Sequence, residues 1–274
     1  MTQTSKFTVF TKPWKNDTLE ALADRVAGLG FQGIELPVRD GFQVNPDNFR
    51  AALPKAVSVL GQKNISIESI AGAIETDLVK AMGHSGVKIL RIMLGADPKK
   101  NYLKQEETYY KTVSELLPVL ESSGVRLGVQ NHCGNFLGSS SAGLMRFVGR
   151  FPKTLVGAVL DLAHCAVAGE IPEFALDIAA SHLVMVNIKN GRWQRINAES
   201  ENEAIGKIIW TSGCDGTLSW KLAAEELRRR NYGVPICFTA EYSDKDRHFE
   251  GEESAALIIK DIQYWNTLLM RNEE

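Results

Sequence analysis

The sequence has little of several features that would assign it to a specialised class of protein. Its 274 residues include four cysteines, and these form no C-x-x-C pair. So few cysteines exclude a small disulfide-stapled scaffold and favour reduced thiols, so we expect a cytoplasmic protein. A hydrophobic fraction of 44% with a net charge of −2 also excludes an intrinsically disordered chain.

Long apolar runs and an excess of charge are missing as well. No stretch approaches the roughly 18 apolar residues of a membrane-spanning helix, and residues 1–10 hold no apolar signal-peptide core. We therefore expect no membrane partner. The near-neutral charge lacks the basic stripe of a nucleic-acid binder, and we interpret the three arginines at 228–230 as a solvated helix face, so we expect no nucleic-acid partner.

What the sequence does have is an alternation of two patterns. Short apolar, β-branched runs are typical of buried parallel strands. Between them, apolar residues recur at helical spacing at 19–26, 113–120, 220–227 and 258–269. Asp17 is the expected cap of the first helix, and Gly30 follows its end. The predicted strands are Phe7–Phe10, 33–38, 65–71, 89–94, 126–132, 156–162, 183–189 and 236–242.

Eight strand–helix units without a linker predict one (β/α)8 TIM barrel over residues 1–274, with a long loop at 190–216. A doubly wound open sheet is the rival, because it shows the same alternation. The G-x-G-x-x-G motif at 28–33 ends a helix and enters a strand. A dinucleotide site needs the reverse context, so we do not interpret this motif as one.

Polar residues gather at the predicted strand ends. In a barrel of this kind the carboxyl ends of the strands meet at the active site. Polar groups inside apolar strands are costly unless they are paired or bind something, so we expect them to converge on one site. They are Glu35, Glu68, Arg91, Gln130, Asn131, His132, Cys133, Asp161, His164, Asn187, Lys189, Asn190, Glu241 and Tyr242.

With these residues the chain resembles the xylose-isomerase-like TIM-barrel superfamily, the sugar phosphate isomerase/epimerase group. The resemblance covers nearly the whole barrel and does not specify a substrate. It is carried by Gly33-Ile34-Glu35-Leu36, Gln130-Asn131-His132, Asp161-Leu162-Ala163-His164, Asn187-Ile188-Lys189-Asn190 and Glu241-Tyr242.

The resemblance implies one divalent metal ion, Mn²⁺ or Mg²⁺, and assigns its ligands to Gln130, Asp161, Asn187 and Glu241. Gln130 stands where the family has a glutamate, and Asn187 stands where it has a histidine. Neutral amide oxygens are weaker donors than carboxylates, and they move the preference from zinc toward hard cations. The family's epimerases move the proton with two carboxylates, and Gln130 stands in the place of one of them.

The predicted chemistry is proton abstraction next to a carbonyl. We expect Glu241 to act as ligand and base, His132 as the second acid or base, and Lys189 as the group that neutralises the enolate oxygen. Expected contacts with the substrate come from Glu35, Glu68, Arg91, His164, Arg192 and Trp14.

The loop at 190–216 is interpreted as a lid or a dimer contact that places Arg192 on an anionic group, or else as a flap on its own barrel. The absence of a clear phosphate cradle favours an unphosphorylated substrate. The sequence allows a homo-oligomer.

The predicted function is therefore a sugar or keto-sugar isomerase or epimerase acting on a small carbohydrate. A lyase or dehydratase that uses the same enolate is the alternative among enzymes. A non-catalytic sugar-binding protein on the same fold is the alternative of another class. A DNA-repair endonuclease of this superfamily is disfavoured, because five histidines and a slight negative charge suit neither three metals nor a basic face.

Overall fold

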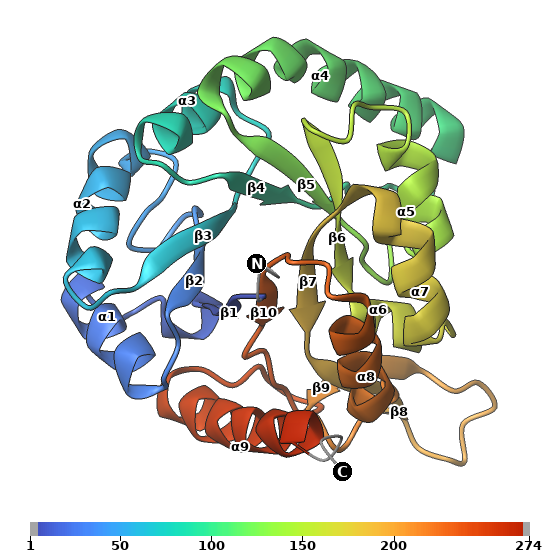
Figure 1. Cartoon of the computed structure of the whole chain (residues 1–274). Coiled ribbons are helices and arrows are strands. Elements are labelled where there is room, and N and C mark those ends of the chain that lie inside the picture. The colour runs from blue at the N-terminus through green and yellow to red at the C-terminus, as the bar shows by residue number, and fades with distance from the viewer. Residues whose placement is uncertain (1–4, 271–274) are drawn as a thin grey trace.

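Eight strands close into a barrel in the computed structural model, which describes residues 5–270 (Figure 1). Around the ring the order is β1-β10-β7-β6-β5-β4-β3-β2, and all these pairs are parallel. The predicted TIM barrel is confirmed and the open sheet is wrong; residues 1–4 and 271–274 of the predicted domain lie outside the described part. The strands are β1 Phe7–Phe10, β2 Gly33–Pro37, β3 Ser66–Ala71, β4 Ile89–Ile92, β5 Arg126–Gln130, β6 Val156–Asp161, β7 Leu183–Ile188 and β10 Ile236–Phe238.

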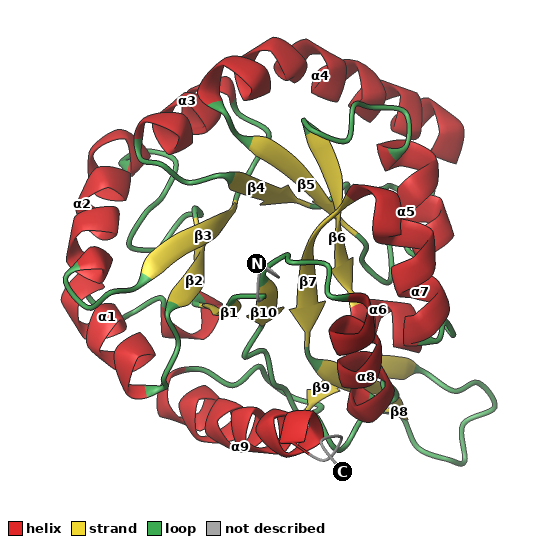
Figure 2. Cartoon of the chain, in the orientation of Figure 1, coloured by secondary structure: helices red, strands yellow, loops and turns green. Residues whose placement is uncertain are grey.

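Helices surround the strands as an outer ring (Figure 2). The four predicted helical stripes all lie within these helices. Two short 3₁₀ helices, η1 Lys12–Trp14 and η2 Ala180–His182, complete the described elements. The α-helices are α1 Leu19–Gly28, α2 Phe49–Gly61, α3 Thr76–His84, α4 Tyr102–Ser123, α5 Ser141–Val148, α6 Leu162–Val167, α7 Pro172–Ala179, α8 Trp220–Arg230 and α9 Gly251–Met270.

The start of α1 corrects one expectation. Thr18, not Asp17, caps the helix, because its side chain accepts a hydrogen bond from the Ala21 amide. Asp17 instead binds Arg25 with an Nε–Oδ2 distance of 2.7 Å. Gly30 follows the helix with a φ of 84°, a left-handed conformation that glycine adopts without strain.

The core has two layers. The larger cluster contains helix and strand side chains, and it fills the space between the ring of helices and the barrel. The smaller cluster contains strand side chains only, which places it inside the barrel. Its members are Phe10, Ala71, Val159, Val184, Met185 and Cys237. The barrel is therefore filled by side chains and leaves room for chemistry only at its ends.

The segment at 190–216 contains a hairpin rather than an irregular loop. Strands β8 Asn190–Arg195 and β9 Gly206–Thr211 pair antiparallel, with Asn190 opposite Thr211. The hairpin projects outward from the ring (Figure 1). Buried Asn190 anchors its base, because its amide group donates to the carbonyls of Gly213 and Leu218.

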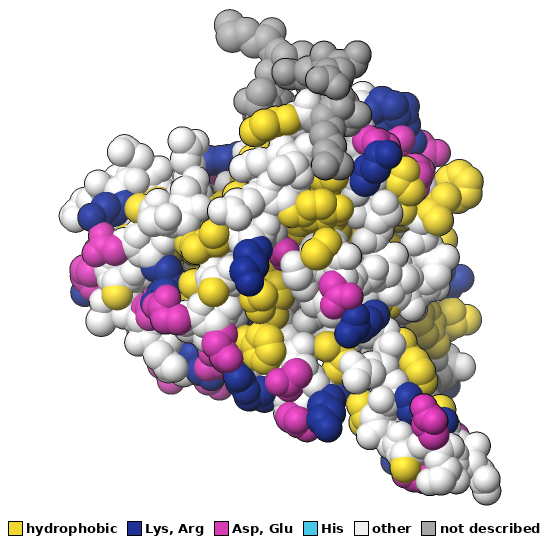
Figure 3. Space-filling model, turned by 90° about the horizontal axis from the view of Figure 1, so that it is seen from below, with side chains coloured by type: hydrophobic (Ala, Val, Ile, Leu, Met, Phe, Trp, Pro, Cys, Tyr) yellow, Lys and Arg dark blue, Asp and Glu magenta, His cyan; other side chains and the backbone are white. Residues whose placement is uncertain are grey.

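The described surface carries no helix with the length and hydropathy needed to cross a membrane. On the face drawn in Figure 3, basic and acidic side chains are interspersed. The motif at 28–33 runs from the end of α1 to the start of β2, so the context that argued against a dinucleotide site is confirmed.

Candidate active site

The carboxyl ends of the strands bring the polar side chains together at one end of the barrel, which we call the mouth. On one side of the mouth, Glu35 of β2 and Arg91 of β4 form a bidentate ion pair, with Nε–Oε1 and Nη2–Oε2 distances of 2.7 Å. Ser69 donates a further hydrogen bond to Glu35 at 3.1 Å. Both charged groups are buried, so each keeps the other in one position.

A carboxamide connects this ion pair to the next carboxylate. Arg91 Nη1 donates to Gln130 Oε1 at 2.6 Å, and Gln130 Nε2 donates to Asp161 Oδ2 at 3.0 Å. Asn131 fixes the backbone of Asp161 by donating to its carbonyl and accepting from its amide. Gln130 can serve a guanidinium and a carboxylate at once because an amide has an acceptor end and a donor end.

Asp161 lies where β6 passes into α6, and it caps that helix. Its Oδ1 accepts from the amides of Ala163 and His164 at 3.1 and 3.3 Å. Lys189 Nζ lies 3.4 Å from its Oδ2. Burial raises the pKa of Asp161, while the Lys189 ammonium opposes that rise. The carboxylate is therefore held by amide donors on one oxygen and a cation on the other.

Lys189 also binds Glu241, which follows β10. The Nζ–Oε2 distance is 3.0 Å, and Lys12 Nζ donates to the other carboxylate oxygen. Burial alone would raise the pKa of Glu241, yet Lys189 and Lys12 hold it well below its usual range. Burial would likewise lower the pKa of Lys189, and the carboxylates of Asp161 and Glu241 raise it. Lys189 is thus a fixed positive charge between two carboxylates.

Trp210 encloses this charge. The indole comes from β9, at the base of the hairpin, and the Lys189 ammonium lies 4.1 Å from its ring centroid. The same ring meets the imidazole of His164 edge-on at 4.9 Å. Lys189 is 6% exposed as a result. The hairpin therefore packs on its own barrel through Trp210, and a lid or a dimer contact stays a prediction.

His132 has a defined tautomer. Its Nδ1 lies 2.7 Å from the carbonyl oxygen of Cys133, and a carbonyl only accepts, so Nδ1 carries the proton. Nε2 is then the basic nitrogen. Burial lowers the pKa of His132 to about 4, so the ring is neutral near pH 7. A neutral imidazole of this kind can accept a proton.

A His/Cys/His group lies beside the mouth. Ligand atoms of His132, Cys133 and His164 lie within 4.8 Å of one another, and the two imidazole rings, tilted by 36°, have centroids 3.9 Å apart. His164 Nδ1 lies 3.1 Å from the Cys133 sulfur. Burial lowers the pKa of His164 well below its usual range and raises that of the Cys133 thiol. The group is therefore uncharged near neutral pH.

A cavity of about 70 Å³ opens at the mouth, between side chains of the barrel strands and of the segments that follow them. Asn187 faces it with a buried Oδ1 that has no hydrogen-bond partner among the described residues. Arg39 also faces it and has no ion-pair partner within residues 5–270; burial lowers its pKa. The cavity is lined by Phe10, Lys12, Arg39, Arg91, Met93, Gln130, His132, Asn187, Lys189, Thr239 and Glu241.

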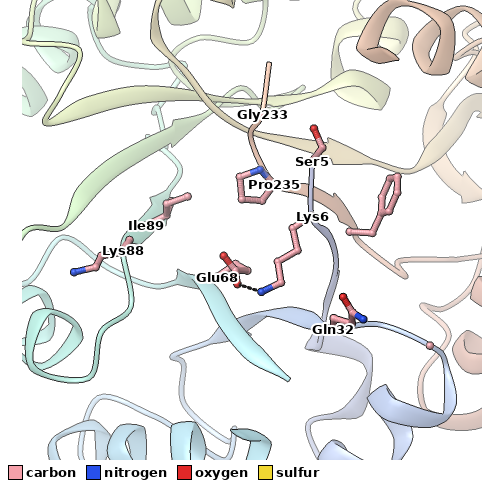
Figure 4. Close-up of a pocket in the computed structure, with 10 residues that line it drawn as sticks. Ser5, Lys6, Gln32, Glu68, Lys88, Ile89, Gly233 and Pro235 are labelled. Carbon is pink, nitrogen blue, oxygen red and sulfur yellow. Dashed lines mark hydrogen bonds and ion pairs between the residues drawn. The ribbon is translucent and has the colours of Figure 1, made fainter. Parts of the chain in front are cut away.

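One predicted site residue lies at the opposite end of the barrel. Glu68 points to the amino ends of the strands, where it accepts from Ser66 at 2.6 Å. It also accepts from Lys6 at 2.6 Å (Figure 4). These residues border a cavity of about 590 Å³ that is lined by residues preceding or starting β1, β2, β4 and β10. Glu68 was expected at the mouth because it is a polar residue within a predicted barrel strand. Its position two residues after the start of β3 puts it at the other end, so that expectation is wrong.

Four further expected contacts need correction. Trp14 is 1% exposed and donates to the Gly251 carbonyl, so it packs and does not face the mouth. His164 and Glu35 are fully buried, and neither lines the cavity. Arg192, on β8 of the hairpin, binds exposed Asp215, which follows β9, and does not line the cavity. Asn190 and Tyr242, also expected there, bind the base of the hairpin and Asp261 of α9 instead. The cavity at the mouth is lined by Arg91, Gln130, His132, Asn187, Lys189 and Glu241.

Lys12, Arg39 and Trp210 are among the residues at the mouth that the sequence prediction missed. Lys12 and Arg39 each lie two residues beyond the end of a barrel strand, β1 and β2. The rule that found the other residues could have found these two. Trp210 was recognised only as part of the long loop, because the hairpin that folds it back over Lys189 is not visible in a hydrophobic pattern.

The side chains that the resemblance assigns to a divalent metal do not fit one in this arrangement. Both ends of the Gln130 amide are engaged, by Arg91 and Asp161. The Lys189 ammonium lies between the carboxylates of Asp161 and Glu241. Asn187 Oδ1 is the one donor left free among the four expected ligands. A single neutral oxygen does not make a site for Mg²⁺ or Mn²⁺, which bind several oxygens and favour carboxylates.

The family model for the xylose isomerase-like TIM barrel matches residues 23–268. Among curated proteins, no sequence match is found.

Solved structures of similar fold cover nearly the whole chain. D-psicose 3-epimerase from Clostridium cellulolyticum H10, solved with D-tagatose, has 15% identity and a TM-score of 0.73 over 96% of this chain and 99% of its own. The probable 3-DHS dehydratase AsbF from Bacillus anthracis has 13% identity and a TM-score of 0.71 over 97% and 100%. The 3-keto-D-glucoside 4-epimerase YcjR from E. coli has 12% identity and a TM-score of 0.71 over 96% and 99%. At these identities the likeness shows a shared fold.

Proposed function

The chain belongs to the xylose isomerase-like TIM-barrel family, and from that premise we propose that it is an enzyme that moves a proton next to the carbonyl of a small sugar or keto-sugar, as an isomerase or epimerase does. One observation carries this proposal: a neutral, tautomer-fixed imidazole and a fixed ammonium line the same cavity. A base and an electrophile at one carbonyl are what enolisation needs.

Lys189 is the proposed electrophile. When a carbon next to a carbonyl loses its proton, negative charge develops on the carbonyl oxygen, and a preorganised cation stabilises that charge. The ammonium lies at the cavity wall and is held by Asp161 and Glu241, so it needs no rearrangement to act. Lys12 supplies a second ammonium on the outer side of Glu241.

His132 is the proposed base. Its Nε2 takes the proton from carbon, the C–H electron pair forms the enediolate double bond, and the carbonyl π pair moves onto the oxygen. For isomerisation the hydroxyl proton on the deprotonated carbon passes to the former carbonyl oxygen, a new carbonyl forms at that carbon, and His132 returns its proton to the former carbonyl carbon. For epimerisation a proton must be delivered on the opposite face, and Glu241, which is ionised at rest, can deliver one only after it has accepted a proton itself. The strands that carry Glu241 and His132, β10 and β5, are three steps apart around the ring.

The charge of the mouth points to the class of carbohydrate. Three carboxylates, Glu35, Asp161 and Glu241, face four cations, Lys12, Arg39, Arg91 and Lys189. Arg39 is the cation without a carboxylate among the described residues. A substrate with one carboxylate, such as a keto-sugar acid, would complete the balance. The unpaired Asn187 Oδ1 suits a sugar hydroxyl as donor.

Elimination from the same enolate is the second candidate. Gln130 stands in the position of one of the family's two carboxylates, and its amide is fully engaged. With fewer groups able to return a proton, loss of a β-hydroxyl as water becomes the competing fate of the enolate.

Deuterium exchange tests the proposal directly. The enzyme is incubated in D₂O with neutral ketohexoses and with hexuronates, and the sugars are followed by proton NMR. We expect deuterium at the carbon next to the carbonyl, faster for the acids, and lost in Lys189→Met and His132→Asn. A new species of equal mass, apart from deuterium, indicates isomerisation or epimerisation, and a species lighter by one water indicates elimination. Binding without exchange would favour a sugar-binding protein instead.

A further inference from the structure

We propose that the ammonium of Lys189 occupies the position of a divalent cation in this barrel, so that the protein binds no such cation there until Lys189 is removed. The charges and contacts of the mouth alone support this role of Lys189, independently of the proposed reaction.

The first observation is the position of the ammonium. Lys189 Nζ lies 3.4 Å from Asp161 Oδ2 and 3.0 Å from Glu241 Oε2. These are the two carboxylates among the four side chains that the resemblance assigns to a metal. A cation placed between them would share its position with the ammonium. The pair is therefore already bridged by a positive charge that the chain itself supplies.

The second observation is the charge balance around that position. Glu241 is also bound by Lys12, and Asp161 accepts from two helix amides and from Gln130. Each carboxylate oxygen is thus engaged by a donor. A divalent cation would add two charges to a mouth in which cations already outnumber carboxylates, and like charges at this distance repel strongly in a poorly solvated site.

The third observation is the enclosure of Lys189. Trp210 covers the ammonium at 4.1 Å, and the side chain is 6% exposed. The indole face favours a cation and leaves the ammonium little room to withdraw. The two carboxylates and the indole together hold the ammonium in one position.

The remaining donors predict what the site becomes without the ammonium. Substitution of Lys189 by methionine leaves Asp161 Oδ2 and Glu241 Oε2 facing each other, with the free Asn187 Oδ1 in the adjoining cavity. Two carboxylates and an amide oxygen are a ligand set that Mn²⁺ accepts. The variant should therefore acquire the cation site that the wild type lacks.

The experiment is a titration with Mn²⁺ of protein first freed of metal by chelation and gel filtration. Free Mn²⁺ is measured by electron paramagnetic resonance and the heat of binding by calorimetry. Only binding that Asp161→Asn abolishes is counted, which separates this site from adventitious ones. We expect Lys189→Met to bind one Mn²⁺ at least tenfold more tightly than the wild type, and Lys189→Met with Asp161→Asn to lose that binding.

Lys12→Met is the matched control. It removes the other ammonium on Glu241 and leaves Lys189 in place, so it should bind no more tightly than the wild type. Should Lys189→Met fail to fold, Lys189→Gln takes its place, and the wild-type titration needs no variant of Lys189. The proposal is overturned if the wild type binds Mn²⁺ through Asp161 as tightly as the Lys189 variant does. It is also overturned if no Lys189 variant binds Mn²⁺ through Asp161.

A consequence for activity rests on the proposed function: chelators should leave the rate of proton exchange unchanged. Failure of the two proposals can be told apart. A wild type that binds no Mn²⁺ and exchanges no sugar proton contradicts only the proposed function. A wild type that binds Mn²⁺ through Asp161 and exchanges the proton contradicts only the role of Lys189.

Discussion

The two ends of the barrel differ in a way that cavity size does not reveal. The amino end has a cavity of about 590 Å³ bordered by one ion pair, Lys6–Glu68, whose side chains are 39% and 26% exposed. The mouth has a cavity of about 70 Å³. Around it, buried charges form a continuous series of contacts from Glu35 to Glu241. Buried charge is costly and is retained where it is used, so the smaller cavity is the better candidate site.

The two ends also differ in how their charges are stabilised. Lys6 and Glu68 are reached by water, which screens their attraction. At the mouth, the charged groups of Glu35, Arg91, Asp161 and Lys189 are buried, so each depends on its neighbours in the protein. Matched substitutions at the two ends should therefore have different effects.

The largest difference is expected for two histidines that make the same hydrogen bond. His132 at the mouth and His84 at the end of α3 each have Nδ1 within 2.8 Å of a backbone carbonyl. Only His132 faces the cavity. His132→Asn should lower the rate of proton exchange by about 10²–10⁴-fold, the usual contribution of a general base. His84→Asn should leave the rate at that of the wild type. Equal rates for all three proteins would remove His132 from the mechanism.

The next comparison concerns stability. Arg91→Met leaves Glu35 buried without its bidentate partner and should lower the free energy of unfolding by about 3–5 kcal/mol. Lys6→Met breaks the partly exposed pair at the other end and should cost less than about 1 kcal/mol. Urea denaturation followed by circular dichroism measures both. If the two variants lose the same stability, the ends of the barrel do not differ in the way described.

The same difference explains what the sequence could predict. Eight apolar strands and the helical stripes between them determine the ring, because those patterns report burial directly. The rule that polar residues follow the strands found most of the mouth, including Lys189 and Glu241. The rule identifies the strand that carries a polar residue but not the position of that residue along the strand. It therefore misplaced Glu68, which lies at the opposite end of the barrel.

Two other features were outside the reach of pattern reasoning. Whether Trp14 faces a substrate or the core depends on how η1 packs against α9, a contact between residues more than 200 positions apart. The position of Lys189 between Asp161 and Glu241 depends on side-chain conformation at three strand ends. A pattern of residue types named all three residues but could not show that a lysine lies where a cation was expected.

Acidification should weaken the mouth before it affects the rest of the barrel. The pKa of His132 is about 4 in the folded protein against an ordinary 6.5, so between these values only the unfolded chain gains the proton. The free energy of unfolding is therefore at its full value above about pH 6.5 and falls as the pH is lowered toward 4. We expect this residue to lower the free energy of unfolding by about 2 kcal/mol, a loss that water limits by screening the exposed part of the ring.

The measurement is urea denaturation at a series of pH values. His164, whose pKa is lowered well below its usual range, adds to the same slope. His132→Asn should therefore reduce the slope between pH 6.5 and 4 without abolishing it. A slope unchanged by that substitution would mean that the buried imidazole is protonated in the folded protein.

The smallest effect is expected at the hairpin, which joins the mouth to the outer surface. Trp210 faces Lys189, whereas Trp193 on the paired strand is 56% exposed. Trp210→Leu removes the aromatic face from the ammonium, which is worth about 1–2 kcal/mol at a desolvated site. The substitution should weaken substrate binding by about tenfold, because the charge that meets the carbonyl oxygen becomes less fixed.

Trp193→Leu changes the same residue type on the same hairpin and should leave binding unchanged. Isothermal titration of both variants with the sugar acid that exchanges fastest decides the matter. Equal weakening would show that the hairpin acts through its overall stability, and weakening confined to Trp210→Leu would show that it acts through the contact with Lys189.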